Sequence, residues 1–157
     1  EEFAGSDSGC FRHIFSNPPY YDNSLTNPDV RETAARHTES LSYREIIAFA
    51  AERLVRPAPD CPGIAGGTLS MILPAEEEMG LKRYAASFGF RPLRTVYVRT
   101  TAAKQPKRIV MELGRAAGGD SSAHGTLPSA ETLTIMENGR YSDRYISLTD
   151  DFYLNLH

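Results

Sequence analysis

FRHIFSNPPY, residues 11–20, is the stretch that decides how this sequence folds. Its first five residues, Phe11 to Phe15, form a short stretch with three apolar side chains that is prone to form a β-strand. The strand is expected to stop at Ser16-Asn17-Pro18-Pro19, because proline has no N–H to donate to a sheet. In a doubly wound α/β sheet, ligands bind outside the carboxyl ends of the strands. The loop that begins at Asn17 is therefore expected at a ligand site.

Helix and strand patterns alternate along the next part of the chain. Ser42 and Glu45 form a capping box, and apolar residues at helical spacing follow up to about residue 56. Acidic residues at 76–78 suit the start of a second helix, which Gly89 is expected to terminate. Strands are expected at Thr68 to Leu73, Leu93 to Arg99, Arg108 to Leu113, Glu131 to Met136 and Arg140 to Leu148, the last two joined by a hairpin turn at Glu137-Asn138-Gly139. This order predicts an α/β sheet that is parallel at first and ends in antiparallel edge strands.

Two long polar stretches separate these elements. Residues 20–40 are rich in Asn, Asp, Thr and Pro, and a connection of this length usually has a functional role. We therefore expect an active-site loop at residues 20–40. Residues 114–130 are of low complexity and predict a flexible surface loop.

The length and composition indicate one globular domain over residues 1–157. An apolar fraction of 41% and a charged fraction of 24% are typical of soluble proteins, and no apolar run approaches the roughly 20 residues of a membrane helix. Cys10 and Cys61 stand alone, without the spacing of a metal site or a disulfide framework. We therefore expect a cytoplasmic protein with no membrane segment and no metal ion.

The net charge of −3 conceals a strong segregation along the chain. Residues 81–115 carry 9 basic and 1 acidic side chains, whereas residues 1–80 carry 6 basic and 13 acidic ones. One interpretation is a solvated face whose charges pair with the acidic flanks. The other is a phosphate-binding surface, because affinity for a nucleic-acid backbone depends on local Lys and Arg. The composition alone leaves both open.

Asn17-Pro18-Pro19-Tyr20 has the chemistry to hold an aromatic amine. An adenine amino group is a poor nucleophile because its lone pair is conjugated into the ring, so fixed acceptors for its N–H groups assist transfer. The side chain of Asn17 offers one acceptor, and the Pro18 carbonyl, aimed by a stiff backbone, offers the other. Tyr20 can stack on an extruded base. The alternative is a tight turn that only ends the strand.

The segment Ile14 to Tyr21 resembles the signature of class I amino-methyltransferases, which act on adenine and occasionally on glutamine or guanine. Three further stretches, Ala35 to Thr38, Lys104 to Arg108 and Tyr141 to Leu154, are similar to bacterial methyltransferases that modify adenosine 37 of a valine tRNA at N6. The resemblance covers nearly the whole chain. It implies the C-terminal part of a Rossmann-like methyltransferase sheet, S-adenosylmethionine as the cofactor and tRNA as the partner.

The resemblance also implies roles for individual residues. Asn17, Pro18, Pro19 and Tyr20 take the catalytic position, and Asn17 also borders the cofactor. The residues expected to contact the RNA are Tyr21, Arg36, His37, Lys104, Lys107 and Arg108. Arg36 and His37 could instead order the loop over the site or form an ordinary surface pair, and the basic residues could form an ordinary charged turn. Residues 150–153 are expected to form a docking element with buried aromatic rings.

The cofactor-binding half of such an enzyme is not found in this sequence. A complete methyltransferase of this class has, upstream, a strand followed by a glycine-rich turn and an acidic residue for the ribose. Here Gly5 and Gly9 follow no predicted strand, and Gly66-Gly67 precedes one. We therefore expect the chain to be the C-terminal portion of a larger enzyme. An uncovered sheet edge would allow self-association.

The sequence thus predicts a tRNA (adenine-N6)-methyltransferase that is incomplete in this chain. Two alternatives stay open. The same chemistry could act on another amine, such as a release-factor glutamine or a ribosomal RNA base. The chain could also be a non-catalytic RNA-binding or assembly fragment that uses only its basic segment.

Overall fold

The computed structural model describes residues 10–18, 42–56, 66–115 and 128–153. The active-site loop expected at residues 20–40 lies outside these residues, as does most of the stretch 114–130. Gly114 and Arg115 belong to a strand, so the loop predicted there begins later than the sequence indicates.

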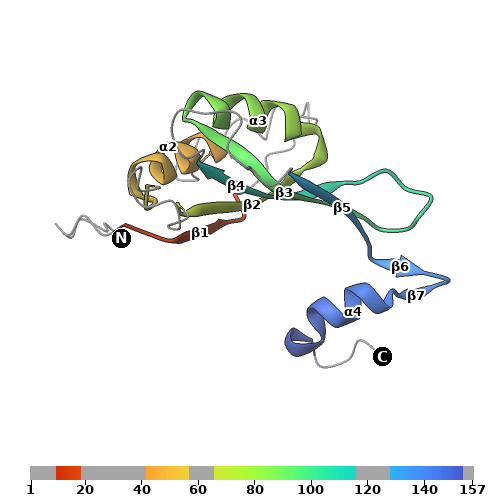
Figure 1. Cartoon of the computed structure of the whole chain (residues 1–157). Helices are drawn as coiled ribbons and strands as arrows, with labels where there is room; N and C mark the ends of the chain where they lie inside the picture. The colour runs from red at the N-terminus through yellow and green to blue at the C-terminus, as the bar shows by residue number, and fades with distance from the viewer. Residues whose placement is uncertain (1–9, 19–41, 57–65, 116–127, 154–157) are drawn as a thin grey trace, which may run out of the picture.

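Five strands form one sheet in the order β1-β2-β4-β3-β5 (Figure 1). Their bounds are His13–Ser16 for β1, Thr68–Pro74 for β2, Phe90–Arg99 for β3, Arg108–Arg115 for β4 and Ser129–Thr134 for β5. β1 is parallel to β2, and β3 is parallel to β5, whereas β4 is antiparallel to both of its neighbours. The predicted α/β fold class is confirmed.

The antiparallel strand does not lie where the sequence predicts it. Antiparallel strands are expected at the edge, but β4 lies inside the sheet, and the edge strand β5 is parallel to β3. The short loop at residues 100–107 closes an antiparallel β3–β4 hairpin, because a connection of that length cannot cross the sheet. Either strand of this hairpin could pair with the rest of the sheet. Tertiary packing decides which strand does so, and here β4 pairs with β2.

Two helices cover one face of the sheet (Figure 1). α2 spans Tyr43–Arg53, and α3 spans Glu78–Ser87 after a single 3-10 turn, η1, at Ala75–Glu77. Gly89 follows α3 with a φ of 75°, a left-handed conformation that favours glycine. Both helices predicted from the sequence are confirmed.

The hydrophobic core lies between these helices and the sheet. Its buried members are Ile46, Ile47, Ala50, Ala51, Leu54, Leu69, Met71, Leu73, Leu81, Ala85, Phe90, Ile109, Met111 and Leu113. Glu78 also fastens α3 to the sheet, since its carboxylate accepts hydrogen bonds from Tyr97 at 2.7 Å and from Lys82 at 2.5 Å. Burial alone would raise the pKa of Glu78, but the hydrogen bonds from Lys82 and Tyr97 outweigh it and lower that pKa.

A tight backbone junction holds the start of β1. The N–H of Phe11 donates to the carbonyl of Arg53 at 2.8 Å, and the N–H of Gly67 donates to the carbonyl of Val55 at 2.8 Å. A Cβ on Gly67 would lie only 2.8 Å from the carbonyl oxygen of Phe11, so this approach requires glycine. The end of α2 and the start of β2 thus position β1, and with it the loop at Asn17.

The tail after β5 departs most from the prediction. β6 (Met136–Glu137) and β7 (Arg140–Tyr141) form the expected hairpin, with Asn138 and Gly139 at φ values of 51° and 77°. The strand expected at Arg140 to Leu148 is wrong beyond Tyr141. The chain instead forms α4 (Asp143–Thr149) and the 3-10 turn η2 (Asp150–Phe152).

Ser142 explains this change from strand to helix. Its hydroxyl accepts the N–H of Tyr145 at 3.2 Å and donates to the carbonyl of Thr134 at 2.6 Å. The residue therefore caps α4 and ties the helix to the end of β5. A single capping serine is a weak sequence signal, and the alternation of Tyr141, Tyr145 and Ile146 with polar residues is ambiguous between strand and helix.

The aromatic residues at the end of the tail are exposed, contrary to the prediction. Phe152 is 82% exposed and Tyr153 is 55% exposed. Burial requires a neighbouring layer, and the composition of a segment does not specify that layer.

The N-cap of α2 leads to the first testable prediction. The side chain of Ser42 accepts the N–H of Glu45, and the Glu45 carboxylate accepts the N–H of Ser42 at 2.6 Å. We expect Ser42→Ala to lower the free energy of unfolding by about 1 kcal/mol, because the first turn of α2 loses its capping acceptor. Urea unfolding measures the loss. Ser42→Thr, which retains the acceptor and the hydroxyl that donates to Glu45, should stay near the parent, and an equal loss in both variants would contradict the capping role.

Candidate active site at the carboxyl edge of the sheet

The register of the sheet brings one end of every strand to the same edge. Ser16 pairs with Met71 near the ends of β1 and β2, Pro74 pairs with Arg108, and Arg99 pairs with Thr134. The carboxyl ends of β1, β2, β3 and β5 therefore lie together with the amino end of β4. This edge is where α/β sheets of this kind bind ligands.

Asn17 lies at this edge, directly after β1. Its side chain is exposed, whereas the following Pro18 is buried. Burial of Pro18 anchors the first residue of the loop, and the fixed φ of proline restricts the backbone that follows Asn17. An exposed amide on an anchored backbone is suited to meet a ligand that approaches from solvent.

A cleft of about 590 Å³ opens beside Asn17. Most of its lining is apolar, with Phe15, Met71, Ile72, Val96, Val98, Val110, Leu133 and Leu148, and its polar lining residues are Ser16, Asn17, Ser70, Arg94 and Glu112. A volume of this size lies in the range of small-molecule sites.

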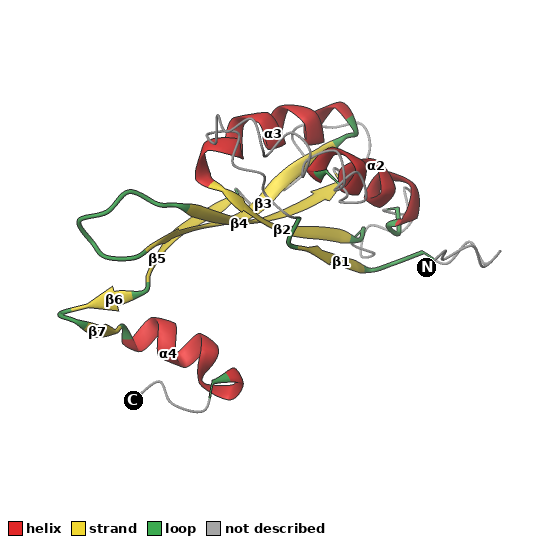
Figure 2. Cartoon of the chain, turned by 180° about the vertical axis from the view of Figure 1, so that it is seen from behind, coloured by secondary structure: helices red, strands yellow, loops and turns green. Residues whose placement is uncertain are grey.

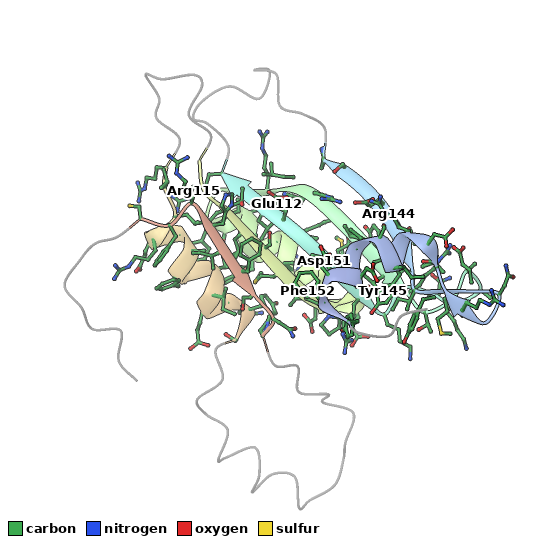
Figure 3. All side chains as sticks on the ribbon, turned by 90° about the horizontal axis from the view of Figure 1, so that it is seen from below. Glu112, Arg115, Arg144, Tyr145, Asp151 and Phe152 are labelled. Atoms are coloured by element: carbon green, nitrogen blue, oxygen red, sulfur yellow. The ribbon has the colours of Figure 1, made fainter. Side chains whose placement is uncertain are left out.

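The cleft lies on the face of the sheet opposite α2 and α3. α4 runs on that side of the sheet (Figure 2), and its Leu148 contributes to the wall of the cleft. Ile72, Val96 and Val110 alternate with core residues along their strands, so the sheet is apolar on both faces. Such a pattern is typical of mainly parallel sheets that are covered on both sides. In Figure 3, α4 carries Arg144 and Tyr145 across part of this face, and Glu112 lies on the sheet, where it lines the cleft.

Charged side chains border the cleft near α4. Glu131 of β5 pairs with Arg94 of β3 and, at 3.2 Å, with Arg144 of α4. The hydrogen bond from Arg94 is the main reason that the pKa of the Glu131 carboxyl is lowered. These side chains are 38% to 61% exposed, so the pairs orient α4 more than they stabilise the fold.

A second group of basic residues projects from the same edge. Lys104, Lys107 and Arg108 are all exposed, on the loop between β3 and β4 and at the start of β4. Arg99 braces this loop, since its guanidinium donates to the carbonyl of Ala102 at 3.1 Å and to the hydroxyl of Thr134 at 2.9 Å. With strands about 4.8 Å apart, the loop lies roughly 10–14 Å along the edge from β1.

Comparison with curated proteins identifies relatives along most of the chain. Over 144 residues, or 91% of this chain, the sequence is 37% identical to the tRNA1(Val) (adenine(37)-N6)-methyltransferase of Porphyromonas gingivalis. It is 32% identical over 143 residues to the protein of the same name from Bacteroides fragilis. This chain is homologous to these tRNA methyltransferases. The resemblance inferred from the sequence is confirmed, and no protein-family model matches the chain.

The chain spans about half the length of the tRNA methyltransferases that it matches. The shared region covers 51% of the Porphyromonas gingivalis protein and 54% of the Bacteroides fragilis protein. Similarity along the sequence does not identify the residues that bind or react, so the roles assigned to individual residues of this chain stay predictions.

Solved structures agree on the fold. A predicted O-methyltransferase from Agrobacterium tumefaciens matches with a TM-score of 0.57 and 16% identity, over 89% of this chain and 51% of that one. A modification subunit described as part of a type I restriction enzyme from Vibrio vulnificus matches with a TM-score of 0.51 and 12% identity, over 96% of this chain and 33% of that one. The Rossmann-like methyltransferase sheet expected from the sequence is confirmed.

The structure brings some of the predicted site residues together. Asn17, Pro18, Lys104, Lys107 and Arg108 all lie at the carboxyl edge. The other predicted site residues are Pro19, Tyr20, Tyr21, Arg36 and His37, and they lie outside the described residues.

Two features of the site are not predicted from the sequence. One is the apolar wall of the cleft, although the β-branched residues Val96, Val98 and Val110 at alternate positions are a signal for it. The other is the bracing role of Arg99, which depends on contacts with Ala102 and Thr134 that only folding creates.

Among the residues that the structure describes, no group of three or more His, Cys, Asp or Glu side chains could hold a metal ion. In the same part of the chain, no helix is long and apolar enough to cross a membrane.

Proposed function

We propose that this chain carries the amine-holding part of an S-adenosylmethionine-dependent methyltransferase that acts on N6 of an adenine in tRNA, adenosine 37 by analogy with its relatives. The observation that carries this proposal is the exposed Asn17 at the carboxyl end of β1, in the lining of a cleft of about 590 Å³. Homology to tRNA adenine methyltransferases over 91% of the chain supports it.

Asn17 and Pro18 have the groups that such a reaction needs. The Asn17 side-chain oxygen accepts one N–H of the adenine amine, and the Pro18 carbonyl accepts the other. The amine is then oriented with its lone pair toward the methyl donor, and this orientation accounts for much of the rate. Buried Pro18 keeps the two acceptors in place. Tyr20 is proposed to stack on the extruded adenine, with Pro19 restricting the backbone between them.

The described residues fit the acceptor side of this site. Asn17 is the one residue that we assign to the border with the cofactor. Among the described residues no strand is followed by a glycine-rich turn, since Gly67 precedes β2 and packs against the carbonyl of Phe11. S-adenosylmethionine, when bound, supplies the methyl group. The residues of this chain hold and orient the amine that receives it.

The substrate is tested by methyl transfer from labelled S-adenosylmethionine. Because the chain is proposed to carry only the amine-holding part, it replaces the matching half of the Porphyromonas gingivalis relative. This chimera and, as a positive control, the relative itself are incubated separately with tRNA, ribosomal RNA and a release factor. We expect label in tRNA, as N6-methyladenine. Label only in the release factor or in ribosomal RNA would contradict the tRNA substrate and favour the same chemistry on another amine.

Lys104 and Lys107 are proposed to contact RNA phosphates. We expect the double variant Lys104→Glu/Lys107→Glu to weaken tRNA binding at least about tenfold and to reduce the salt slope of log K by about 2, since each lost phosphate contact removes roughly 0.9. Fluorescence anisotropy at several salt concentrations measures both quantities.

The matched control for this variant is Arg83→Glu/Arg91→Glu. Both arginines are exposed and belong to the same basic segment, but Arg83 is on α3 and Arg91 is at the opposite end of β3. The control should keep the parent salt slope. Equal losses in the two double variants would show that overall charge, and not this loop, attracts the RNA.

Tyr21, Arg36 and His37 are also proposed to contact RNA near the target base. We also propose a cytoplasmic location for the protein, because its proposed substrate, tRNA, is found in the cytoplasm. Self-association through the edge strand β1 stays a prediction. It is suggested by the place of β1 at the edge of the sheet, where, within the part of the chain that the structure describes, β1 pairs only with β2. Sedimentation velocity over a range of concentrations measures it.

A further inference from the structure

Two segments project together from the carboxyl edge, namely the loop at residues 100–107 and the β6–β7 hairpin (Figure 1). The N–H of Met136 donates to the carbonyl of Thr100 at 2.8 Å, and the N–H of Ile135 donates to the carbonyl of Arg99 at 2.9 Å. The hairpin is therefore bonded to the base of the basic loop and continues the same surface.

β7 places two RNA-compatible side chains on this surface. Arg140 is exposed, and within the described residues its guanidinium makes no hydrogen bond or ion pair. Tyr141 is 41% exposed, and its ring stacks on Tyr145 with the centroids 5.2 Å apart and the planes at 27°. Tyr145 thus packs against one face of the Tyr141 ring, and the exposed part of the ring is its other face. Because successive side chains of a strand point to opposite faces, the ring and the arginine flank the two sides of the hairpin. A supported aromatic ring of this kind can bind an unpaired base.

We infer that Arg140 and Tyr141 form the far end of the RNA-binding surface, where Tyr141 stacks on a base and Arg140 contacts a phosphate. This inference rests on the proposed function and extends it, because neither residue belongs to the site predicted from the sequence. The RNA strand that carries the target adenine would then run along the carboxyl edge, from Asn17 past the basic loop to the hairpin.

The sheet gives the length of this path. β5, which leads into the hairpin, is the fourth strand from β1, and a strand spacing of about 4.8 Å places it about 19 Å away. Stacked nucleotides advance about 3.4 Å each along one strand. The hairpin would therefore contact the RNA about five or six nucleotides from the target adenine.

The local charges indicate how the hairpin binds. Glu137 pairs with Arg140 in the hairpin register, and Asp143 starts α4, so the positive charge of Arg140 is balanced nearby. Long-range attraction to phosphates should then come from the 100–107 loop, and the hairpin should contribute mainly by stacking. Stacking depends little on salt, which separates the two contributions in an experiment.

The test compares two RNAs that share the target adenine. One is an RNA stem-loop with the adenine in its loop and a full stem, and the other is a single strand trimmed to about two nucleotides on each side of the adenine, too short to reach β7 even when its backbone is fully extended. Binding is measured by anisotropy at several salt concentrations. We expect Tyr141→Ala to weaken binding of the stem-loop RNA about fivefold or more at every salt concentration and to leave the trimmed RNA unaffected. Arg140→Ala should also affect only the longer RNA.

Two control variants guard against an indirect effect. Tyr141→Phe retains the ring and should bind both RNAs like the parent. Phe152→Ala removes an aromatic residue that is 82% exposed at the other end of α4, and it should also bind both RNAs like the parent. Circular dichroism establishes that each variant is folded.

Measurements on the two RNAs distinguish two negative outcomes. In one, the β6–β7 hairpin does not contact RNA, and in the other, tRNA is not the substrate. Equal effects of Tyr141→Ala on both RNAs, or an effect on neither, would overturn the inference and leave the proposed function standing. If the folded parent binds neither RNA, both the tRNA substrate and this surface are wrong, and a protein partner for the hairpin becomes the better explanation.

Discussion

Asn17→Ala is expected to lower the rate of methyl transfer to tRNA by about 100- to 1,000-fold while RNA affinity stays near that of the parent. The side-chain oxygen of Asn17 is the proposed acceptor for one amine N–H, and its interaction orients the amine in the transition state. Loss of this acceptor should therefore appear in kcat rather than in the affinity for RNA. Single-turnover methylation with labelled S-adenosylmethionine measures the rate, and anisotropy measures the affinity.

Two further variants of this site distinguish its role from simple structure. Asn17→Asp keeps an acceptor at the same position and should retain more activity than Asn17→Ala. Ser16→Ala changes the preceding residue, which also lines the cleft, and should retain most of the activity. Full activity of Asn17→Ala would refute the catalytic proposal, and the chain would then be better explained as a non-catalytic RNA-binding or assembly fragment.

Leu69→Ala is expected to lower the free energy of unfolding by about 2–5 kcal/mol. Leu69 is fully buried in β2, on the face that packs against the helices, and its removal leaves a cavity between the sheet and the helices. Ile72 lies on the same strand, on the opposite face, and is 38% exposed. Ile72→Ala should therefore cost less, about 1–2 kcal/mol, because more than a third of the side chain is already in contact with water.

The comparison of Leu69 with Ile72 tests whether the two faces of the sheet differ. Urea unfolding of both variants gives the two free energies. An equal loss at Ile72 would mean that the cleft face is buried in solution, by self-association or by another polypeptide. That outcome would contradict the open cleft beside Asn17 as the structure shows it.

Local signals predict the elements that depend on near neighbours in the chain. The capping box at Ser42 and Glu45 and the terminator Gly89 place both long helices correctly, because caps and left-handed turns are contacts within a few residues. The same holds for the turn at Asn138 and Gly139. Helix α4 is not predicted, because Ser142 is stabilised as its cap by a hydrogen bond to Thr134, a residue of the preceding strand.

For the candidate site too, local sequence identifies the residues, whereas tertiary contacts decide how they are arranged. Asn17-Pro18-Pro19-Tyr20 and the lysines of residues 104–107 are identified from residue chemistry alone, since amide, ring and ammonium groups have the same capacities in any fold. That Asn17, Lys104 and Arg140 share one edge could not be predicted, because it depends on which strand pairs with which. Insertion of β4 between β2 and β3 brings the basic loop to the carboxyl end of β1.

The sequence by itself determined the α/β class and the end of β1 just before Asn17, because these follow from local patterns, and it is the source of the amine-holding role proposed for Asn17, which rests on the groups that this side chain carries. The tertiary structure decided the strand order, the cleft beside Asn17 and the attachment of the β6–β7 hairpin to the basic loop. These features depend on hydrogen bonds and packing between segments far apart in the chain, which no local pattern specifies.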